Sequence, residues 1–170
     1  MIEEEGDMFE SYADAMAITT NGFLKKNNES VMGRGCARQL ADLYPWMPRE
    51  LGRAIGEHGN CVNPIGYHRG TKIYSFPVKP ISVVFDGKNA VGHMARKFRK
   101  GETIPGWAAV AQLDLIELSA RQLKQLADKE NHERILIPRP GCGAGELKWE
   151  DVRPVLNDIL DDRFISMHNE

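Results

Sequence analysis

The sequence is poor in cysteine and has no long apolar run. Its three cysteines, Cys36, Cys61 and Cys142, are odd in number and far apart, so they lack the spacing of a disulfide framework. No apolar stretch approaches the ~20 residues that a membrane-spanning helix needs. The acidic start, MIEEEGD, also lacks the basic and then apolar layout of a signal peptide. These absences favour a cytoplasmic protein that has no membrane partner.

A strong excess of charge of either sign is also missing. The formal net charge of −2 gives no overall attraction to nucleic acid or to an anionic membrane, so such a partner would need a local basic patch. Hydrophobic residues make up 42% and charged residues 27% of the chain, proportions typical of a globular protein. The length of 170 residues favours one domain, 1–170, with a sizeable core.

The apolar residues that are present alternate between strand and helix periods. The run RILIPRP, which begins at Arg134, has an apolar core without polar alternation, which is typical of a strand covered on both faces. The pattern predicts an α/β layered fold with a mixed sheet. The predicted strands are 13–21, two runs around Arg69 and Gly70, 134–137 and 163–168; the predicted helices are 33–44, 48–59, 109–129 and one that begins near Trp149.

Residues 81–108 fit none of these elements and are interpreted as an insertion. Two readings stay open for this segment. It is either a solvated excursion with a short helix of its own or a basic flap over an anionic ligand. Its basic side chains outnumber its acids, and they are Lys88, Arg96, Lys97, Arg99 and Lys100 against Asp86 and Glu102.

Two glycine-rich segments follow predicted strands and open predicted helices. The first is MGRGCA, at residues 32–37, and the second is PRPGCGAGE, at residues 138–146. In layered α/β folds, ligands bind beyond the carboxyl ends of strands. Glycines let a backbone approach a phosphate closely, and consecutive N–H groups there form an anion-binding concavity. Two such loops in one domain could together hold a diphosphate.

Several motifs, in order along the chain, resemble those of macro domains. GDMFESYADAMAITTNG resembles their opening, VMGRGCARQLADLYP their first phosphate loop, and ILIPRPGCGAGELKWEDVRPVL their second, as it occurs in the branch with the ADP-ribosyl-DNA and ADP-ribosyl-glutamate hydrolases. The resemblance covers most of the chain except 81–108. It implies a three-layer α/β/α sandwich with a mixed central sheet that binds ADP-ribose without a metal or another cofactor. It also implies hydrolysis of an ADP-ribosyl linkage on protein or nucleic acid, or removal of the phosphate from ADP-ribose 1″-phosphate.

The resemblance further implies roles for individual residues. Asp7 would accept a hydrogen bond from the adenine amino group, with the backbone N–H of Met8 beside it. Asn21 would contact and orient the distal ribose, and Leu147 would help to wall it. The two phosphate loops would comprise Gly33, Arg34 and Gly35, and then Gly141, Cys142, Gly143, Ala144 and Gly145.

Two departures from the macro-domain pattern leave the chemistry open. Related hydrolases often carry an acid two positions after Gly-Cys-Gly, where this chain has Gly145 and places Glu146 one step later. Some relatives have a catalytic lysine near the first loop, where this chain offers Arg34. Arginine stays protonated and cannot act as a base, although it can clamp a phosphate. Asn21, Arg34 and Glu146 are therefore the catalytic candidates of a hydrolase, and a binding module without turnover is the alternative.

Two other groups of residues could bind a partner or a metal. If the insertion grips DNA that bears ADP-ribose, its contacts to the nucleic-acid backbone would be Arg96, Lys97, Arg99 and Lys100. His58 and Cys61 have a spacing that metal ligands could have, yet no matching pair follows, so no metal site is predicted. His68 at the hairpin and His132 before a strand are interpreted as surface residues.

Overall fold

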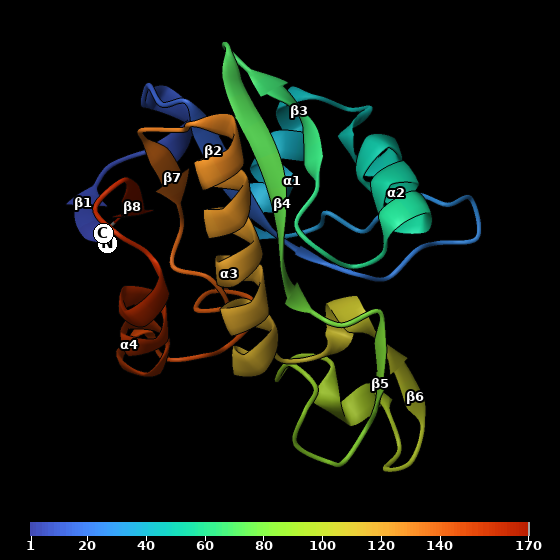
Figure 1. Ribbon diagram of the computed structural model, residues 1–170. Coiled ribbons are helices and arrows are strands. Elements are labelled where there is room, and N and C mark those ends of the chain that lie inside the picture. The colour runs from blue at the N-terminus through green and yellow to red at the C-terminus, as the bar shows by residue number, and fades with distance from the viewer. Residues whose placement is uncertain (170) are drawn as a thin grey trace.

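A six-stranded mixed sheet forms the centre of the computed structural model, which describes residues 1–169 (Figure 1). Five of its strands are parallel to their neighbours, and β3 is antiparallel to β4. The order across the sheet is β1-β8-β7-β2-β4-β3. The strands are β1 (Ile2–Glu5), β2 (Ala15–Asn21), β3 (Pro64–His68), β4 (Thr71–Lys79), β7 (Ile135–Ile137) and β8 (Phe164–His168).

Helices cover both faces of this sheet, as Figure 1 shows. Alternate residues of β2 point to opposite faces: Ala15 and Ala17 pack in the core under α3 and α4, whereas Met16 and Ile18 pack in the core under α1 and α2. The three-layer α/β/α sandwich with a mixed central sheet is thereby confirmed. The helices are α1 (Gly35–Leu43), α2 (Met47–His58), α3 (Leu113–Glu130) and α4 (Trp149–Ile159).

The structure differs from the sequence-based prediction at one strand, β1, and at the start of one helix, α3. Strand β1 was not predicted, because three of its four residues are glutamates; it forms an edge strand beside β8. Helix α3 begins at Leu113 rather than at 109. The backbone of the preceding residues is held by other segments, since Ala111 N donates to Gly145 O and Gln112 N donates to Val78 O.

The insertion, residues 81–108, folds as a small unit beyond the carboxyl end of β4 (Figure 1). It contains an antiparallel pair, β5 (Ser82–Val84) and β6 (Thr103–Pro105), and two three-residue 3-10 turns, Ala95–Lys97 and Gly106–Ala108. The short helix expected in this segment is of the 3-10 type and spans Ala95–Lys97. Gly106 anchors the unit: a side chain there would meet Pro80 O at 1.6 Å.

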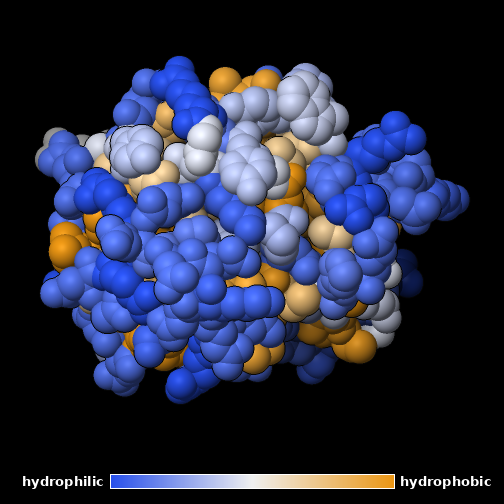
Figure 2. All heavy atoms as spheres, turned by 45° about the horizontal axis from the view of Figure 1, so that its top comes forward, coloured by the Kyte–Doolittle hydropathy of each residue, from blue (hydrophilic) through white to orange (hydrophobic). Residues whose placement is uncertain are grey.

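The tip of the β3–β4 hairpin lies at the end of the molecule opposite the insertion (Figure 1). Figure 2 shows the face that includes the tip of the β3–β4 hairpin, and most of its visible surface is hydrophilic with scattered apolar side chains. Within residues 1–169, no helix is both long enough and apolar enough to cross a bilayer.

Candidate functional site

A cleft of about 430 Å³ lies where the parallel strands β2, β4 and β7 end. Three groups of residues form its walls: the strand ends, the two glycine-rich loops and part of the insertion. The strand ends and the residues just after β7 contribute Thr19, Thr20, Asn21, Val78, Lys79, Pro138 and Arg139; the loops contribute Val31, Gly33, Arg34, Gly35, Cys36, Ala37, Gly141, Gly143, Ala144 and Gly145; the insertion contributes Val91, His93 and Trp107.

The first loop presents the N-terminus of α1 to the cleft. Gly35 begins the helix with a φ of +59°, a left-handed value that favours glycine. A side chain added at Gly35 would meet no atom within 4 Å, and one added at Gly33 would approach only Val31, at 3.9 Å. These glycines therefore border open space, which a ligand can occupy. A helix N-terminus offers unpaired N–H groups and the positive end of the helix dipole, both of which favour an anion.

The second loop contains two kinds of glycine. Gly141 has a φ of +75°, and a side chain there would lie 2.8 Å from Ile116 Cδ1. One at Gly145 would lie 2.6 Å from both Ala111 Cβ and Gly141 O. Gly143, in contrast, has nothing within 4 Å. Only Gly143 of these three thus leaves room for a ligand, whereas Gly141 and Gly145 allow the loop to fold against α3.

The residues expected at adenine lie outside the lining of the cleft. Asp7 is exposed, and its Oδ1 accepts a hydrogen bond from Phe9 N at 2.9 Å, so the carboxylate caps a 3-10 turn. Met8 is buried in the core under α1 and α2. One oxygen of the Asp7 carboxylate has no partner within the described residues. The adenine roles of both residues stay predictions.

Asn21 lines the cleft, yet its side chain already holds the first loop. Its Nδ2 donates to Val31 O and its Oδ1 accepts from Phe23 N, both at 2.9 Å.

Cys142 and Leu147 pack against the core under α3 and α4 and do not line the cleft. Burial raises the pKa of the Cys142 thiol to about 11, so this cysteine is protonated at neutral pH.

Lys79 is a candidate functional residue that sequence reasoning missed. It ends β4, is only 8% exposed, and lines the cleft. Its Nζ donates to Trp107 O at 3.2 Å and to Ala144 O at 3.3 Å, so only carbonyl groups bind it directly. Burial lowers the pKa of this amine to about 8; the charge of Glu146 raises it and that of Arg34 lowers it. The available signal was a lysine at the carboxyl end of an apolar strand, where ligands bind.

The insertion forms part of the cleft wall. Val91 is 2% exposed and lines the cleft together with His93 and Trp107. Arg34 Nη1 lies 3.5 Å from His93 Nδ1, and Glu146 Oε2 accepts a hydrogen bond from Gly92 N at 2.8 Å. The reading as a solvated excursion is therefore wrong for this side of the insertion.

Arg139 is the second arginine of the cleft wall, beside Arg34. Its guanidinium lies 5.1 Å from the centre of the Trp149 ring, a cation–π arrangement. Glu3 Oε1 accepts from Trp149 Nε1 at 2.8 Å and lies 3.8 Å from Arg139 Nη2. The Nε of Arg139 is buried and has no partner among the described residues. The first and second loops thus each carry an arginine at the cleft.

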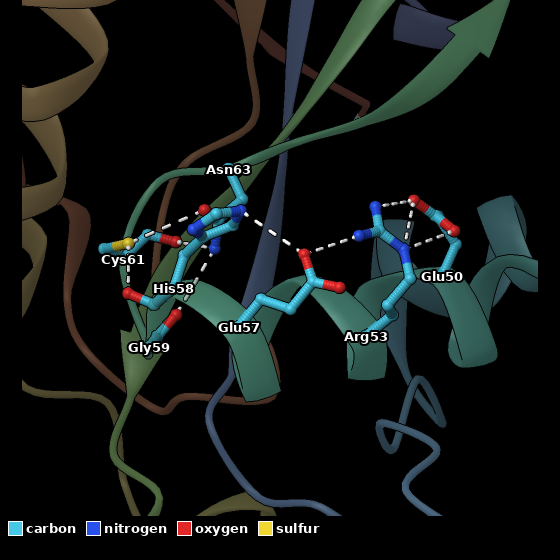
Figure 3. Close-up of polar contacts among 7 residues, drawn as sticks. All are labelled: Glu50, Arg53, Glu57, His58, Gly59, Cys61 and Asn63. Atoms are coloured by element: carbon cyan, nitrogen blue, oxygen red, sulfur yellow. Dashed lines mark hydrogen bonds and ion pairs between the residues drawn. The ribbon is translucent and has the colours of Figure 1, made fainter.

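His58, His68 and Cys61 lie outside the lining of the cleft and make contacts within the protein. Figure 3 shows that Cys61 Sγ contacts His58 O and Asn63 Oδ1 at the end of α2, at 3.4 and 3.6 Å. His68 is buried, with Nε2 2.8 Å from Phe9 O and Nδ1 2.6 Å from Tyr44 Oη, so its interpretation as a surface residue is wrong. Across residues 1–169, no group of three or more His, Cys, Asp and Glu side chains could hold a metal ion.

Comparison with a curated protein gives one informative match along the chain. No family model matches the sequence. The DNA ADP-ribosyl transferase-DNA ADP-ribosyl glycohydrolase fusion protein of Thermosipho africanus is 26% identical over 156 residues, which cover 89% of this chain. They cover 37% of that protein, so the chain spans little more than a third of its length.

Solved structures match the fold over nearly the whole chain. The macrodomain of Mycobacterium tuberculosis DarG has 22% identity and a TM-score of 0.69, with 99% of this chain and 97% of that chain covered. Thermosipho africanus DarTG in complex with ADP-ribose has 18% identity and a TM-score of 0.70, with 99% of this chain and 41% of that chain covered. These matches show that the chain is a macrodomain by fold, as its ordered sequence motifs predicted.

Proposed function

We propose that this macrodomain binds ADP-ribose in the cleft and hydrolyses an ADP-ribosyl linkage, with Lys79 as the catalytic base. Two comparisons support the ligand: the Thermosipho africanus DarTG structure holds ADP-ribose, and the curated relative is named as a DNA ADP-ribosyl glycohydrolase. The cleft itself supports a diphosphate, since Gly33, Gly35 and Gly143 leave open space beside backbone N–H groups. Asp7 and Met8 remain the proposed contacts to adenine.

The observation that carries the hydrolase proposal is the position and charge state of Lys79. Its amine lies between the second loop and the insertion, and its pKa of about 8 leaves part of the population neutral near neutral pH. A neutral amine has a lone pair that can accept a proton. Arg34 at the rim has no such capacity. Asn21 then serves to shape the first loop beside the distal ribose.

The proposed reaction is a displacement at the anomeric carbon of the distal ribose. The Lys79 amine removes a proton from water as the water oxygen bonds to that carbon. The bond from this carbon to the linked group breaks, and its electron pair leaves with that group, which takes up a proton from solvent. Protonated Lys79 then loses its proton to solvent. Because activity needs the neutral amine, the rate should rise with pH through about 8.

Replacing Lys79 tests this assignment. Lys79→Met keeps an unbranched side chain one atom shorter and removes the lone pair, so hydrolysis should fall about 10²–10⁴-fold while ADP-ribose binding persists. The matched control is Lys129→Met, because Lys129 is exposed on α3. Product release should be measured from ADP-ribosylated DNA, ADP-ribosylated protein and ADP-ribose 1″-phosphate, with calorimetry for free ADP-ribose.

Each result decides between the two candidate functions. Wild-type protein that binds ADP-ribose but releases no product from any of the three substrates would show the binding module without turnover. Lys79→Met protein with wild-type activity would remove Lys79 from the mechanism. Trapping of substrate on Lys79 by borohydride would show that the amine attacks the ribose itself instead of activating water.

A further inference from the structure

The insertion meets the rest of the cleft at a small number of polar contacts. Lys79 Nζ donates to one carbonyl on the insertion, Trp107 O, and to one on the second loop, Ala144 O. The only direct hydrogen bond that the described residues form between these two segments joins Gly92 N to Glu146 Oε2, at 2.8 Å. Lys79 therefore lies in a corner whose two walls Glu146 connects.

Glu146 has a backbone conformation that is unusual for a glutamate. Its φ is +65°, in the left-handed region that residues other than glycine and asparagine rarely adopt. The turn is closed by Glu146 N, which donates to Gly143 O at 3.0 Å, and by Leu147 N, which donates to Gly141 O at 2.9 Å. A glycine would adopt this φ without strain, as Gly141 does nearby at +75°. The glutamate side chain thus has a role that glycine could not fill.

The insertion presents a matching donor. Within its turn, Val91 O accepts hydrogen bonds from Met94 N at 2.9 Å and from Ala95 N at 3.0 Å, and Val91 N donates to Ala108 O at 2.9 Å. The intervening Gly92 N–H is left to point out of the turn, toward Glu146. A side chain added at Gly92 would lie 3.7 Å from Glu146 Oε2, so the contact is not forced by crowding.

We propose that Glu146 is a positioning residue that fastens the Val91–His93 turn of the insertion to the second loop and thereby completes the wall around Lys79. The fastening stands on geometry alone. Its effect on catalysis rests on the proposed hydrolase function.

Glu146 acts on Lys79 in two ways that a single substitution can separate. As a hydrogen-bond acceptor it holds Gly92, and a glutamine would keep an acceptor oxygen there. As a negative charge it favours protonated Lys79, which a glutamine would not. The other charged or titratable groups in the cleft wall around Lys79 are Arg34 and Cys36 from the first loop and α1, His93 from the insertion and Arg139 after β7; burial raises the pKa of the Cys36 thiol, which is therefore neutral.

The experiment compares Glu146→Gln and Glu146→Ala in the full chain. Amide hydrogen exchange at residues 91–94 reports the fastening, and the pH dependence of hydrolysis reports the charge. In Glu146→Ala, exchange at Gly92 should rise about fivefold or more, because local opening becomes easier. In Glu146→Gln, exchange should stay near the wild-type rate while the midpoint of the pH–rate profile moves to lower pH. Glu150→Ala, at an exposed acid of α4, is the matched control and should change neither.

The outcomes separate this inference from the proposed function. Wild-type exchange at Gly92 in Glu146→Ala would overturn the fastening, whatever the activity. Loss of protection in Glu146→Gln equal to that in Glu146→Ala would overturn the role of the acceptor oxygen. If the wild-type protein hydrolyses nothing, the hydrolase proposal fails while the exchange data still decide the fastening. Glu146→Gly removes the backbone strain, so it gives the same exchange test if Glu146→Ala does not fold.

Discussion

The two glycine-rich loops look alike in sequence and differ in what their glycines do. In the first loop, Gly33 and Gly35 border open space, so their small size leaves room for a ligand in the cleft. In the second loop, Gly141 and Gly145 border α3 and the segment that leads into it, so their small size serves the fold. Only Gly143 of the second loop resembles the glycines of the first.

This difference shows that a glycine-rich motif mixes two requirements that sequence alone cannot separate. The carbonyl of Gly145 accepts from Ala111 N at 3.0 Å, and that of Gly141 accepts from Leu147 N at 2.9 Å. These bonds hold the loop in a bent shape against the start of α3. The bend leaves Gly143 exposed in the lining of the cleft. Gly141 and Gly145, which pack against the protein, therefore hold the loop in the shape that lets Gly143 border a bound phosphate.

The strongest test of the comparison is Gly145→Val. A side chain there would lie 2.6 Å from Gly141 O, a backbone atom that cannot move without opening the loop. We expect the free energy of unfolding to fall by about 3 kcal/mol, in the upper range for overpacking. Chemical denaturation measures this loss. If Gly145→Val is as stable as wild type, Gly145 is not a packing glycine and the division of the loop is incorrect.

The next effect in size belongs to Gly143→Val, which should spare the fold and impair binding. Gly143 is exposed, has no positive φ and has no neighbour within 4 Å, so valine meets no protein atom. A branched side chain would instead occupy the space that the diphosphate needs. We expect affinity for ADP-ribose to fall about 100-fold, or ~2.7 kcal/mol. A thermal melt and a titration should be read together, and full-strength binding by a folded variant would exclude Gly143 from the phosphate site.

The sequence predicted the layered fold because the period of its apolar residues is clear. Residues 135–137 and 15–18 are apolar throughout, and the sheet buries both of their faces. Strand β1 escaped prediction because its glutamates are tolerated only at an edge, and whether a strand is an edge is a property of the whole sheet. The local pattern of apolar residues therefore predicts whether a segment is a strand better than it predicts where that strand lies in the sheet.

The candidate site was predictable in its loops and not in its chemistry. The glycines stand in recognisable motifs, whereas Lys79 is one of many lysines until β4 brings it beside Ala144 and Trp107. Its lowered pKa arises from burial, which only the packed structure shows. His68 was misjudged for the same reason, since its partners Phe9 and Tyr44 lie far from it in sequence. Long-range contacts supply what motifs lack.

The smallest expected effect concerns the insertion, and it sharpens the comparison by separating the loops from the surface beyond them. Free ADP-ribose tests the cleft alone, whereas an ADP-ribosylated oligonucleotide would also reach the exposed basic side chains Arg96, Lys97, Arg99 and Lys100. None of these four forms an ion pair within the described part of the chain, so each is available to a phosphate.

If they contact the nucleic-acid backbone, each neutralised phosphate should add about 0.7–0.9 to the slope of log affinity against log salt concentration. The double variant Lys97→Gln/Lys100→Gln should therefore reduce that slope by about 1.5 for the oligonucleotide and leave free ADP-ribose binding unchanged. Lys124→Gln/Lys129→Gln on α3 removes the same charge elsewhere and should leave both slopes as in wild type. Equal salt slopes for the two ligands in wild-type protein would mean that the outer face of the insertion meets solvent only, while its inner face still walls the cleft through Val91 and Trp107.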